Sequence, residues 1–260
     1  MRYLGAFWTA LIICWFITPL VRHLAIYWQL VDKPSDRRVN VIPIPTGGGI
    51  AIFLGFLIPV LVVLPLNRPL VGILLTSSLI LLLGLCDDRW GLAPLCKLAG
   101  QIICALLLTS YFGLKIDFVT NPWGGMLFLG AWSVPLTVLW LVAVTNTMNL
   151  IDGLDGLAAG IASIACFPLF LIALQRGQDP IALLTIALAG SCLGFLRHNF
   201  NPARIFMGDG GAMFLGFMLG AIAVQGTLKG PTTIALTVPI LILGVPIFDT
   251  LFAIVRRFQR

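Results

Sequence analysis

The sequence predicts an all-α, polytopic membrane protein with about nine transmembrane helices, and three observations support this. Of its 260 residues, 59% are hydrophobic and only 10% are charged, whereas a water-soluble domain has about a quarter of its residues charged. All ten acidic residues are aspartate, and glutamate, which is common on wetted helix faces, does not occur. Long apolar segments recur along the chain and give a mean hydropathy of +1.04.

The apolar segments have the length that a membrane span needs, roughly 17–25 residues. They cover residues 4–28, 48–66, 70–86, 96–113, 134–150, 157–175, 181–197, 212–227 and 233–255. Connectors rich in Pro, Gly, Asn and Asp separate them, and the longer one at 114–133 is expected to form a small irregular or hairpin element. We predict a single domain over 1–260, with a retained first span rather than a cleaved signal peptide.

Alternation of the spans assigns every connector to one of two faces. Residues 29–47, 87–95, 151–156 and 198–211 share one face with the last residues of the chain. Of the 16 Lys and Arg residues, eleven fall on that face: Arg22, Lys33, Arg37, Arg38, Arg89, Lys97, Arg197, Arg204, Arg256, Arg257 and Arg260. The positive-inside rule then places these connectors in the cytoplasm and the N-terminus outside, in the plasma membrane.

Composition argues against two other kinds of binding site. The net charge of +6 does not indicate nucleic acid, because the basic residues are scattered among apolar segments. The cysteines form no CxxC motif and have no histidine at metal-ligand spacing, so we expect all of them to be small buried hydrophobes. They are Cys14, Cys86, Cys96, Cys104, Cys166 and Cys192.

Five aspartates in the cytoplasmic connectors or at helix ends are expected to converge: Asp87, Asp88, Asp152, Asp155 and Asp209. Removing one unpaired carboxylate from water costs several kcal/mol, and gathering several adds repulsion. Few basic residues lie nearby, so the sequence predicts a hard divalent cation. Mg²⁺, with Mn²⁺ as the alternative, takes one or two protein oxygens together with substrate phosphates.

The stretch 146–156 carries the most informative pattern. Asn146, Asn149 and Asp152 are spaced i, i+3, i+6, so they project from one stripe at a helix end. Gly153 and Gly156 then permit a turn that leaves the acids at the membrane surface. The alternative is that the asparagines only join helices through amide hydrogen bonds.

The stretch 197–211 is a second constellation. Gly208, Gly210 and Gly211 would let backbone amides approach a phosphate at a helix N-terminus, with Asp209 among them as a metal ligand. A polar loop with a capping aspartate is the alternative.

Two shorter motifs leave their function open. Asp87 and Asp88 point in different directions on a helix, so they need not do one job, and they could be a surface acid pair. The Gly-rich turn at 43–49 could line a phosphate site or simply allow close helix packing. The small-residue pairs Gly190/Gly194 and Gly216/Gly220 indicate helix packing.

Taken together, these stretches resemble the polyprenyl-phosphate N-acetylhexosamine-1-phosphate transferase family. The resemblance covers residues 30–257 in order and spacing, through PIPTGGG, DDRWGL, NTMNLIDGLDGLAAG and HNFNPARIFMGDGG. DDRWGLAPLCK and PIPTGGG are more similar to the branch that transfers N-acetylglucosamine-1-phosphate than to the phospho-MurNAc-pentapeptide branch. That second branch usually carries a Lys-containing motif ahead of its Gly-rich turn.

The resemblance implies residue roles. It implies metal ligation by Asp209 with Asn149 close by, nucleotide contacts from Asp152, Asp155 and Phe206, and a place for Asp87 near the lipid phosphate. The candidate set is therefore catalytic Asp87, Asp88 and Asp152; substrate-binding Asn149, Asp155, Asn199, Phe206, Gly48 and Arg38; and metal-binding Asp209 and Asn149.

Two departures from the family pattern stand out. Asn40 occupies a position where members of this branch commonly have histidine. The chain also stops at Arg260, where members continue into a His-rich loop and further helices. We therefore expect a fragment, whose activity on its own is in question.

The implied activity is Mg²⁺-dependent transfer of a sugar-1-phosphate, first of all GlcNAc-1-phosphate, from a UDP-sugar to polyprenyl (undecaprenyl) phosphate. This would be the first membrane step of cell-envelope glycan synthesis. The expected partners are a UDP-N-acetylhexosamine donor, a polyprenyl phosphate acceptor and the lipid bilayer, without nucleic acid and with a homodimer left open. The alternatives are a phospho-MurNAc-pentapeptide transferase, a proton-coupled transporter and an inactive scaffold.

Overall fold

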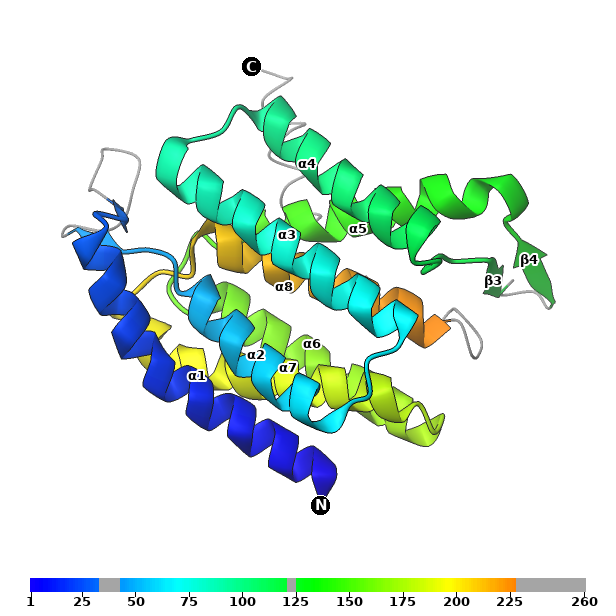
Figure 1. Cartoon of the computed structure of the whole chain (residues 1–260), viewed down its shortest axis with the longest axis horizontal. Helices are drawn as coiled ribbons and strands as arrows, with labels where there is room; N and C mark the ends of the chain where they lie inside the picture. Colours follow the sequence, from blue (N-terminus) through cyan, green and yellow to red (C-terminus); the bar gives the residue numbers. More distant parts are fainter. Residues whose placement is uncertain (33–42, 121–124, 228–260) are drawn as a thin grey trace.

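Figure 1 shows the arrangement of the helices in a computed structural model of the chain, which describes residues 1–32, 43–120 and 125–227. Eight α-helices occur in this described part: α1 (Arg2–Tyr27), α2 (Gly49–Val63), α3 (Arg68–Trp90), α4 (Pro94–Leu106), α5 (Ser133–Ile151), α6 (Leu157–Gln175), α7 (Asp179–Asn199) and α8 (Gly208–Thr227). A π-helical turn at Leu107–Tyr111 extends α4, and a 3₁₀ turn at Gly130–Trp132 precedes α5.

Seven of these helices are long and apolar enough to cross a membrane, counting the extensions of α4 and α5, and α2 is a shorter apolar helix of 15 residues. Large hydrophobic side chains face outward along them, such as Phe16 and Leu20 on α1. The all-α, polytopic class is thus confirmed, and the chain is an integral membrane protein. The ninth predicted span, 233–255, lies outside the described residues.

Successive helices run in alternating directions, so the connectors with polar motifs gather at one end of the bundle, called the motif end below. The last residues of α1, α3, α5 and α7 and the first residues of α2, α4, α6 and α8 lie there (Figure 1). The predicted alternation of the connectors is confirmed for the described helices, whereas the compartment that each end faces stays a prediction.

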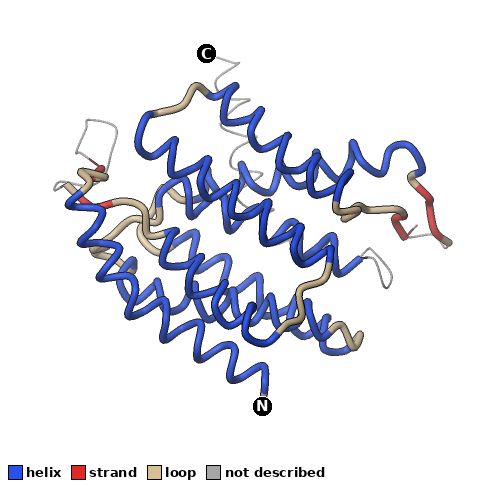
Figure 2. Tube along the Cα trace, viewed as in Figure 1, coloured by secondary structure: helices blue, strands red, loops and turns tan. Residues whose placement is uncertain are grey.

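Two small antiparallel hairpins complete the described structure, and both appear in red in Figure 2. β3 (Phe118–Thr120) pairs with β4 (Met126–Phe128) at the end opposite the motifs, which confirms the hairpin expected within 114–133. β1 (Val31–Asp32) pairs with β2 (Ile44–Pro45) at the motif end. The second pairing was not expected from the sequence, and it ties the Gly-rich turn to the end of α1.

Close helix contacts rest on small residues. A Cβ on Gly190 or Gly194 of α7 would overlap the backbone carbonyls of Phe7 and Leu11 on α1, and one on Gly216 of α8 would overlap the backbone of α5 at Thr145. The sequence assigned these glycines to helix packing, and the structure confirms it. α8 is the central helix, since nearly all its side chains are buried between α3 and α5.

α4 lies at the periphery and packs against α3 and α5. Its buried residues are only Gln101, Cys104 and Ala105. Four cysteines are buried as predicted, but the prediction is wrong for Cys96, which is exposed on the outer side of α4, and Cys86 is only half-buried.

Candidate functional site

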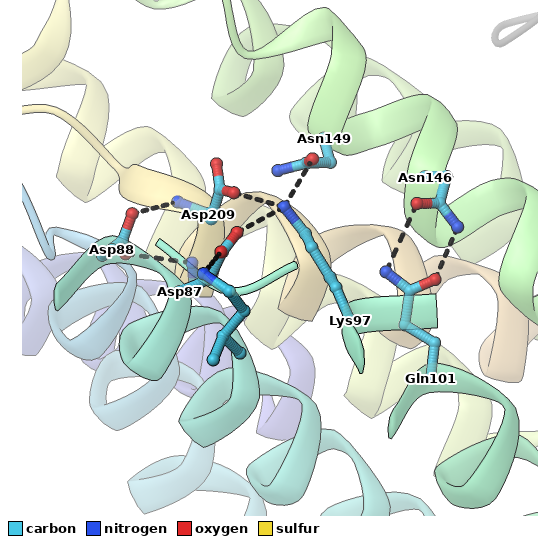
Figure 3. A network of polar contacts seen from close by, with 9 residues as sticks. Asp87, Asp88, Lys97, Gln101, Asn146, Asn149 and Asp209 are labelled. Atoms are coloured by element: carbon cyan, nitrogen blue, oxygen red, sulfur yellow. Dashed lines mark hydrogen bonds and ion pairs between the residues drawn. The ribbon is translucent and has the colours of Figure 1, made fainter. Parts of the chain in front are cut away.

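A lysine joins three motif residues at the motif end (Figure 3). The Lys97 Nζ on the first turn of α4 donates to Asp87 Oδ2 on α3 at 2.6 Å and to Asn149 Oδ1 on α5 at 3.2 Å, and it also bonds Asp209 Oδ2 on α8. We call these four residues the Lys97 cluster. It connects four helices, and the Lys97 side chain is only 16% exposed.

The turn between α3 and α4 explains why Lys97 faces back toward Asp87. Gly91 follows the last residue of α3 and has a φ of +63°, in the left-handed region, and Pro94 is the first residue of α4. Asp87 Oδ1 accepts a hydrogen bond of 2.7 Å from the N–H of Leu92. One carboxylate therefore fixes the turn through one oxygen and holds the lysine through the other.

Asp88, the next residue, serves a different helix. Its Oδ1 accepts from the N–H of Asp209 at 2.8 Å and its Oδ2 from the N–H of Gly210 at 3.2 Å, so it caps the N-terminus of α8. The Asp88 carboxylate therefore already occupies the N–H of Gly210, one of the three glycines whose amides are expected to approach a phosphate, and for Gly208 and Gly211 that expectation stays a prediction. Asp88 thus contacts the helix turn that carries Asp209, and its expected catalytic role stays a prediction.

Glycines bring α8 into contact with two neighbouring helices at this same turn. A Cβ on Gly49 of α2 would overlap the Cα of Gly211, and one on Gly84 of α3 would overlap the Cα of Gly210. The Gly-rich turn at 43–49 could line a phosphate site or allow close helix packing, and at Gly49 the structure shows close helix packing.

The loops at 152–156 and 200–207 are held together by a second polar group. Asn199 Oδ1 accepts from the N–H of Gly156 at 3.1 Å, and its Nδ2 donates to the carbonyl of Ile205 at 3.0 Å. Asp155 Oδ2 accepts from the N–H of Ala203 at 2.9 Å and from Asn201 Nδ2 at 3.1 Å. We call the Asp155 and Asn199 side chains with these partners the loop lock.

Phe206 and Gly48 lie on the other side of the 200–207 loop. The Phe206 N–H donates to the carbonyl of Pro45 at 2.8 Å, and the Gly48 N–H donates to the carbonyl of Phe206 at 3.0 Å. Gly48 is buried against the Phe195 ring. The substrate contacts expected of both residues stay predictions, and Arg38 lies outside the described residues.

The sequence profile described as glycosyl transferase family 4 matches residues 70–227, the segment that carries the Lys97 cluster and the loop lock. The chain belongs to this family. A probable undecaprenyl-phosphate N-acetylglucosaminyl 1-phosphate transferase of Bacillus subtilis is 42% identical over 259 residues, which cover 99% of this chain and 72% of that protein.

Other relatives of this glycosyl transferase family 4 chain carry related names. A decaprenyl-phosphate N-acetylglucosaminephosphotransferase of Mycolicibacterium smegmatis is 41% identical over 96% of this chain and 69% of its own length. A phospho-N-acetylmuramoyl-pentapeptide-transferase of Moorella thermoacetica is 37% identical over 82% of this chain and 68% of its own length. The chain is accordingly a transferase, and the resemblance noted in its motifs is confirmed.

The stripe predicted on α5 divides between two partners in this transferase. Asn149 faces Lys97, and Asn146 pairs with Gln101 on α4 through two amide hydrogen bonds. Asp152 directly follows the last residue of α5. Burial, and after it the nearby carboxylates of Asp209 and Asp88, raises the pKa of Asp152 well above the usual range of an aspartate. Asn146 therefore fits the alternative that these asparagines join helices through amide hydrogen bonds, while Asn149 belongs to the Lys97 cluster.

The residues of the Lys97 cluster fit a hard cation. Three oxygens, from Asp87, Asn149 and Asp209, converge on one ammonium group, which has the charge sign of a metal ion. The described ranges contain no group of three or more His, Cys, Asp or Glu residues that could hold a metal. The predicted metal ligands Asp209 and Asn149 contribute one carboxylate and one amide oxygen to the oxygens that face Lys97. Such a set suits Mg²⁺ when substrate phosphates complete it.

Sequence reasoning missed Lys97 and Gln101 as members of the site. From the sequence, Lys97 is only one of the cytoplasmic charges, and the predicted positive partner of the aspartates is a metal ion. The available signal was the position of Lys97 in the first turn after Pro94, directly beyond the reversal at Gly91. Because the chain reverses direction at Gly91, the first turn of α4 lies beside the last turn of α3.

Proposed function

We propose that this chain transfers N-acetylglucosamine-1-phosphate from UDP-N-acetylglucosamine to a polyprenyl phosphate, giving UMP and the polyprenyl-diphosphate sugar at the cytoplasmic face of the plasma membrane. The observation that carries the proposal is the convergence of Asp87, Asn149 and Asp209 on the ammonium group of Lys97. The names of the relatives in Bacillus and Mycolicibacterium support the choice of sugar and acceptor.

In the proposed reaction an oxygen of the polyprenyl phosphate attacks the β-phosphorus of the donor. The bond from that phosphorus to the bridging oxygen breaks, and UMP leaves with the electron pair. Phosphoryl transfer of this kind depends on positioning and on fixed positive charge rather than on covalent work by the protein. The Lys97 ammonium supplies one such charge between the two carboxylates that border the site.

Asp209 and Asn149 would hold Mg²⁺ through a carboxylate and an amide oxygen. The ion, when bound, neutralises charge on the pyrophosphate and on the departing UMP. Asn149 offers a second function, because its Nδ2 is buried and has no hydrogen-bond partner among the described residues. A buried donor without a partner costs about 1–3 kcal/mol, and a phosphate oxygen of the substrate would satisfy it.

The remaining motif residues act by holding the site together. Asp88 fixes the α8 turn that presents Asp209. The loop lock joins the 152–156 loop, where nucleotide contacts are predicted, to the 200–207 loop. The proposed active site is thus built at the ends of α3, α4, α5 and α8.

The test measures UMP release and formation of the lipid-linked sugar from UDP-N-acetylglucosamine and undecaprenyl phosphate, first with Mg²⁺ and then with excess chelator. Asp209→Asn is expected to lower turnover at least about 10²-fold. Asp117→Asn serves as the matched control, because Asp117 is a half-exposed acid paired with Lys115 at the opposite end. Near-native turnover by Asp209→Asn at ordinary Mg²⁺ would overturn the metal assignment.

A donor panel separates the alternatives. UDP-MurNAc-pentapeptide is the second donor to include, since the Moorella relative is named for that substrate and matches 82% of this chain. Preference for UDP-MurNAc-pentapeptide would replace the proposed sugar. Substrate uptake into vesicles without any UDP-sugar would favour the transporter alternative.

A further inference from the structure

The position of α4 has to be fixed by something other than apolar packing. The helix lies at the edge of the bundle, and three of its residues, Gln101, Cys104 and Ala105, are buried. Lipid tails are as apolar as leucine, so apolar contacts alone give a peripheral helix little preference for one register. Yet Lys97 on this helix has to meet acceptors on α3, α5 and α8 at hydrogen-bond distance.

One polar pair crosses from α4 to α5 beside the Lys97 cluster, at the right of Figure 3. Gln101 Nε2 donates to Asn146 Oδ1 at 3.3 Å, and Asn146 Nδ2 donates back to Gln101 Oε1 at 2.5 Å. Gln101 is fully buried, at 0% exposure. A reciprocal pair of this kind is directional, so sliding or rotating either helix would break both hydrogen bonds.

The pair and the cluster lie on the same faces of the same two helices. Lys97 and Gln101 are four residues apart on α4, and Asn146 and Asn149 are three apart on α5, so each helix presents its two side chains one turn apart. Gln101 meets Asn146 and Lys97 meets Asn149. Fixing the first contact therefore fixes the second.

We propose that Gln101 and Asn146 are positioning residues for the transfer reaction, whose reciprocal amide pair sets the register of α4 and thereby holds Lys97 among Asp87, Asn149 and Asp209. This inference rests on the proposed function. A slip of one residue displaces Lys97 by about 1.5 Å along the helix axis. Misplacement of about 1 Å at a reacting centre can lower a rate about 10²-fold.

The structure offers variants that separate positioning from folding. Gln101→Leu removes the pair, while Asn146 Nδ2 keeps its hydrogen bond of 2.9 Å to the carbonyl of Val142 on its own helix. Gln178→Leu is the matched control, because Gln178 is also a buried glutamine, and from its position directly before α7 it is hydrogen-bonded to α8. Its Nε2 donates to the carbonyl of Gly226 at 3.3 Å, at the end of the bundle opposite the motifs.

The first measurement is steady-state transfer by the purified chain. Gln101→Leu is expected to lower kcat about tenfold or more while KM for the UDP-sugar changes less than about threefold, because only the placement of Lys97 is lost. Gln178→Leu is expected to leave kcat unchanged. An equal fall in kcat for both variants, or a fall that only tracks the folded fraction, would overturn the positioning role.

The second measurement needs no substrate. An amine-acylating reagent is applied to the unliganded protein, and the modification rates of Lys97 and Lys115 are compared by peptide mass spectrometry. The Lys97 side chain is 16% exposed and the Lys115 side chain 38%, so Lys115 serves as the internal reference. Gln101→Leu should raise the Lys97-to-Lys115 ratio several-fold, whereas Gln178→Leu should not.

The outcomes separate the two claims. An unchanged labelling ratio in Gln101→Leu overturns the positioning role whatever the activity. A changed ratio with no transfer by the wild-type chain refutes the proposed function and leaves the register claim standing.

The exchanged pair Gln101→Asn with Asn146→Gln keeps both amides and the summed side-chain length. It should recover a large part of the kcat lost in Gln101→Asn alone. Failure of the exchange to recover either kcat or the labelling ratio would count against the proposal.

Discussion

The Lys97 cluster and the loop lock lie at the same end of the bundle and both contain aspartate and asparagine side chains, yet they differ in how their hydrogen bonds are completed. In the loop lock, both functional groups of the Asn199 amide have backbone partners, and Asn199 is 3% exposed. In the Lys97 cluster, two carboxylates share one ammonium, and Asn149 Nδ2 has no partner within the described part of the chain.

If the proposed function holds, that difference distinguishes residues that support loops from residues that would face a ligand. A polar group that is fully paired with backbone stabilises a loop and has little left to offer a ligand. A cluster of charges with an unpaired donor costs free energy unless a ligand completes it. Sequence motifs alone do not make this distinction, because Asn149 and Asn199 look alike in the chain.

The largest effect is expected at Lys97. Lys97→Met leaves the Asp87 and Asp209 carboxylates facing each other without their cation, so turnover should fall by about 10²-fold or more. UMP release measures this, and Lys115→Met at the opposite end is the control with the same change in charge. Turnover within about threefold of wild type would show that Lys97 is only a structural counterion.

A smaller loss of turnover is expected at Asp88. Asp88→Ala removes the cap from α8 and frees the amides of Asp209 and Gly210. Loss of such a cap costs about 0.5–2 kcal/mol of stability, and the shifted Asp209 should lower turnover by about tenfold. Thermal unfolding and initial rates on the same preparation test both. A stability loss with normal turnover would remove Asp88 from the support of the site.

A substitution in the loop lock should lower mainly the stability of the protein. Asn199→Leu removes two hydrogen bonds to backbone and leaves two buried polar groups unpaired, at a cost of about 2–4 kcal/mol in the free energy of unfolding. Denaturant or thermal unfolding in detergent measures this, while turnover per folded molecule should change much less than in Lys97→Met. A large fall in turnover at unchanged stability would place Asn199 in the substrate site, as the family resemblance implied.

The smallest effect is expected on the stability of the fold when the metal ion is removed. Because Lys97 already provides a positive charge between Asp87 and Asp209, chelation should abolish transfer yet lower the free energy of unfolding much less than Asn199→Leu does. Unfolding curves with and without chelator give the answer. A large loss of stability on chelation would mean that a metal ion, and not Lys97, holds the helices together.

Much of the fold could be predicted from the sequence because it depends on local composition. Each of the first eight predicted spans matches a helix, and the 114–133 hairpin and the packing glycines Gly190 and Gly194 were expected. The meeting of Asp87, Asn149 and Asp209 was also predicted, since alternation of spans places their helix ends together. The roles of these residues, the cofactor and the sidedness stay predictions.

The misses concern contacts between helices. Periodicity tells which face of α4 is polar but not that Gln101 meets Asn146, and it cannot show that Asp88 turns toward α8 while Asp87 turns toward α4. The burial expected for Cys96 was wrong because an apolar environment in sequence does not distinguish a lipid-facing position from a core position. Such pairings depend on helix rotation, which the three-dimensional packing sets.

The shortness of α2 has a consequence for the depth of the proposed site. A helix of 15 residues rises about 22 Å, whereas the hydrocarbon layer is about 30 Å thick. Because α2 begins at Gly49, against the Gly211 turn of α8, its short length is expected to draw this polar turn inward or to thin the bilayer around it. An amphiphile confined to the leaflet could then present its headgroup to the protein without being lifted out of the lipid.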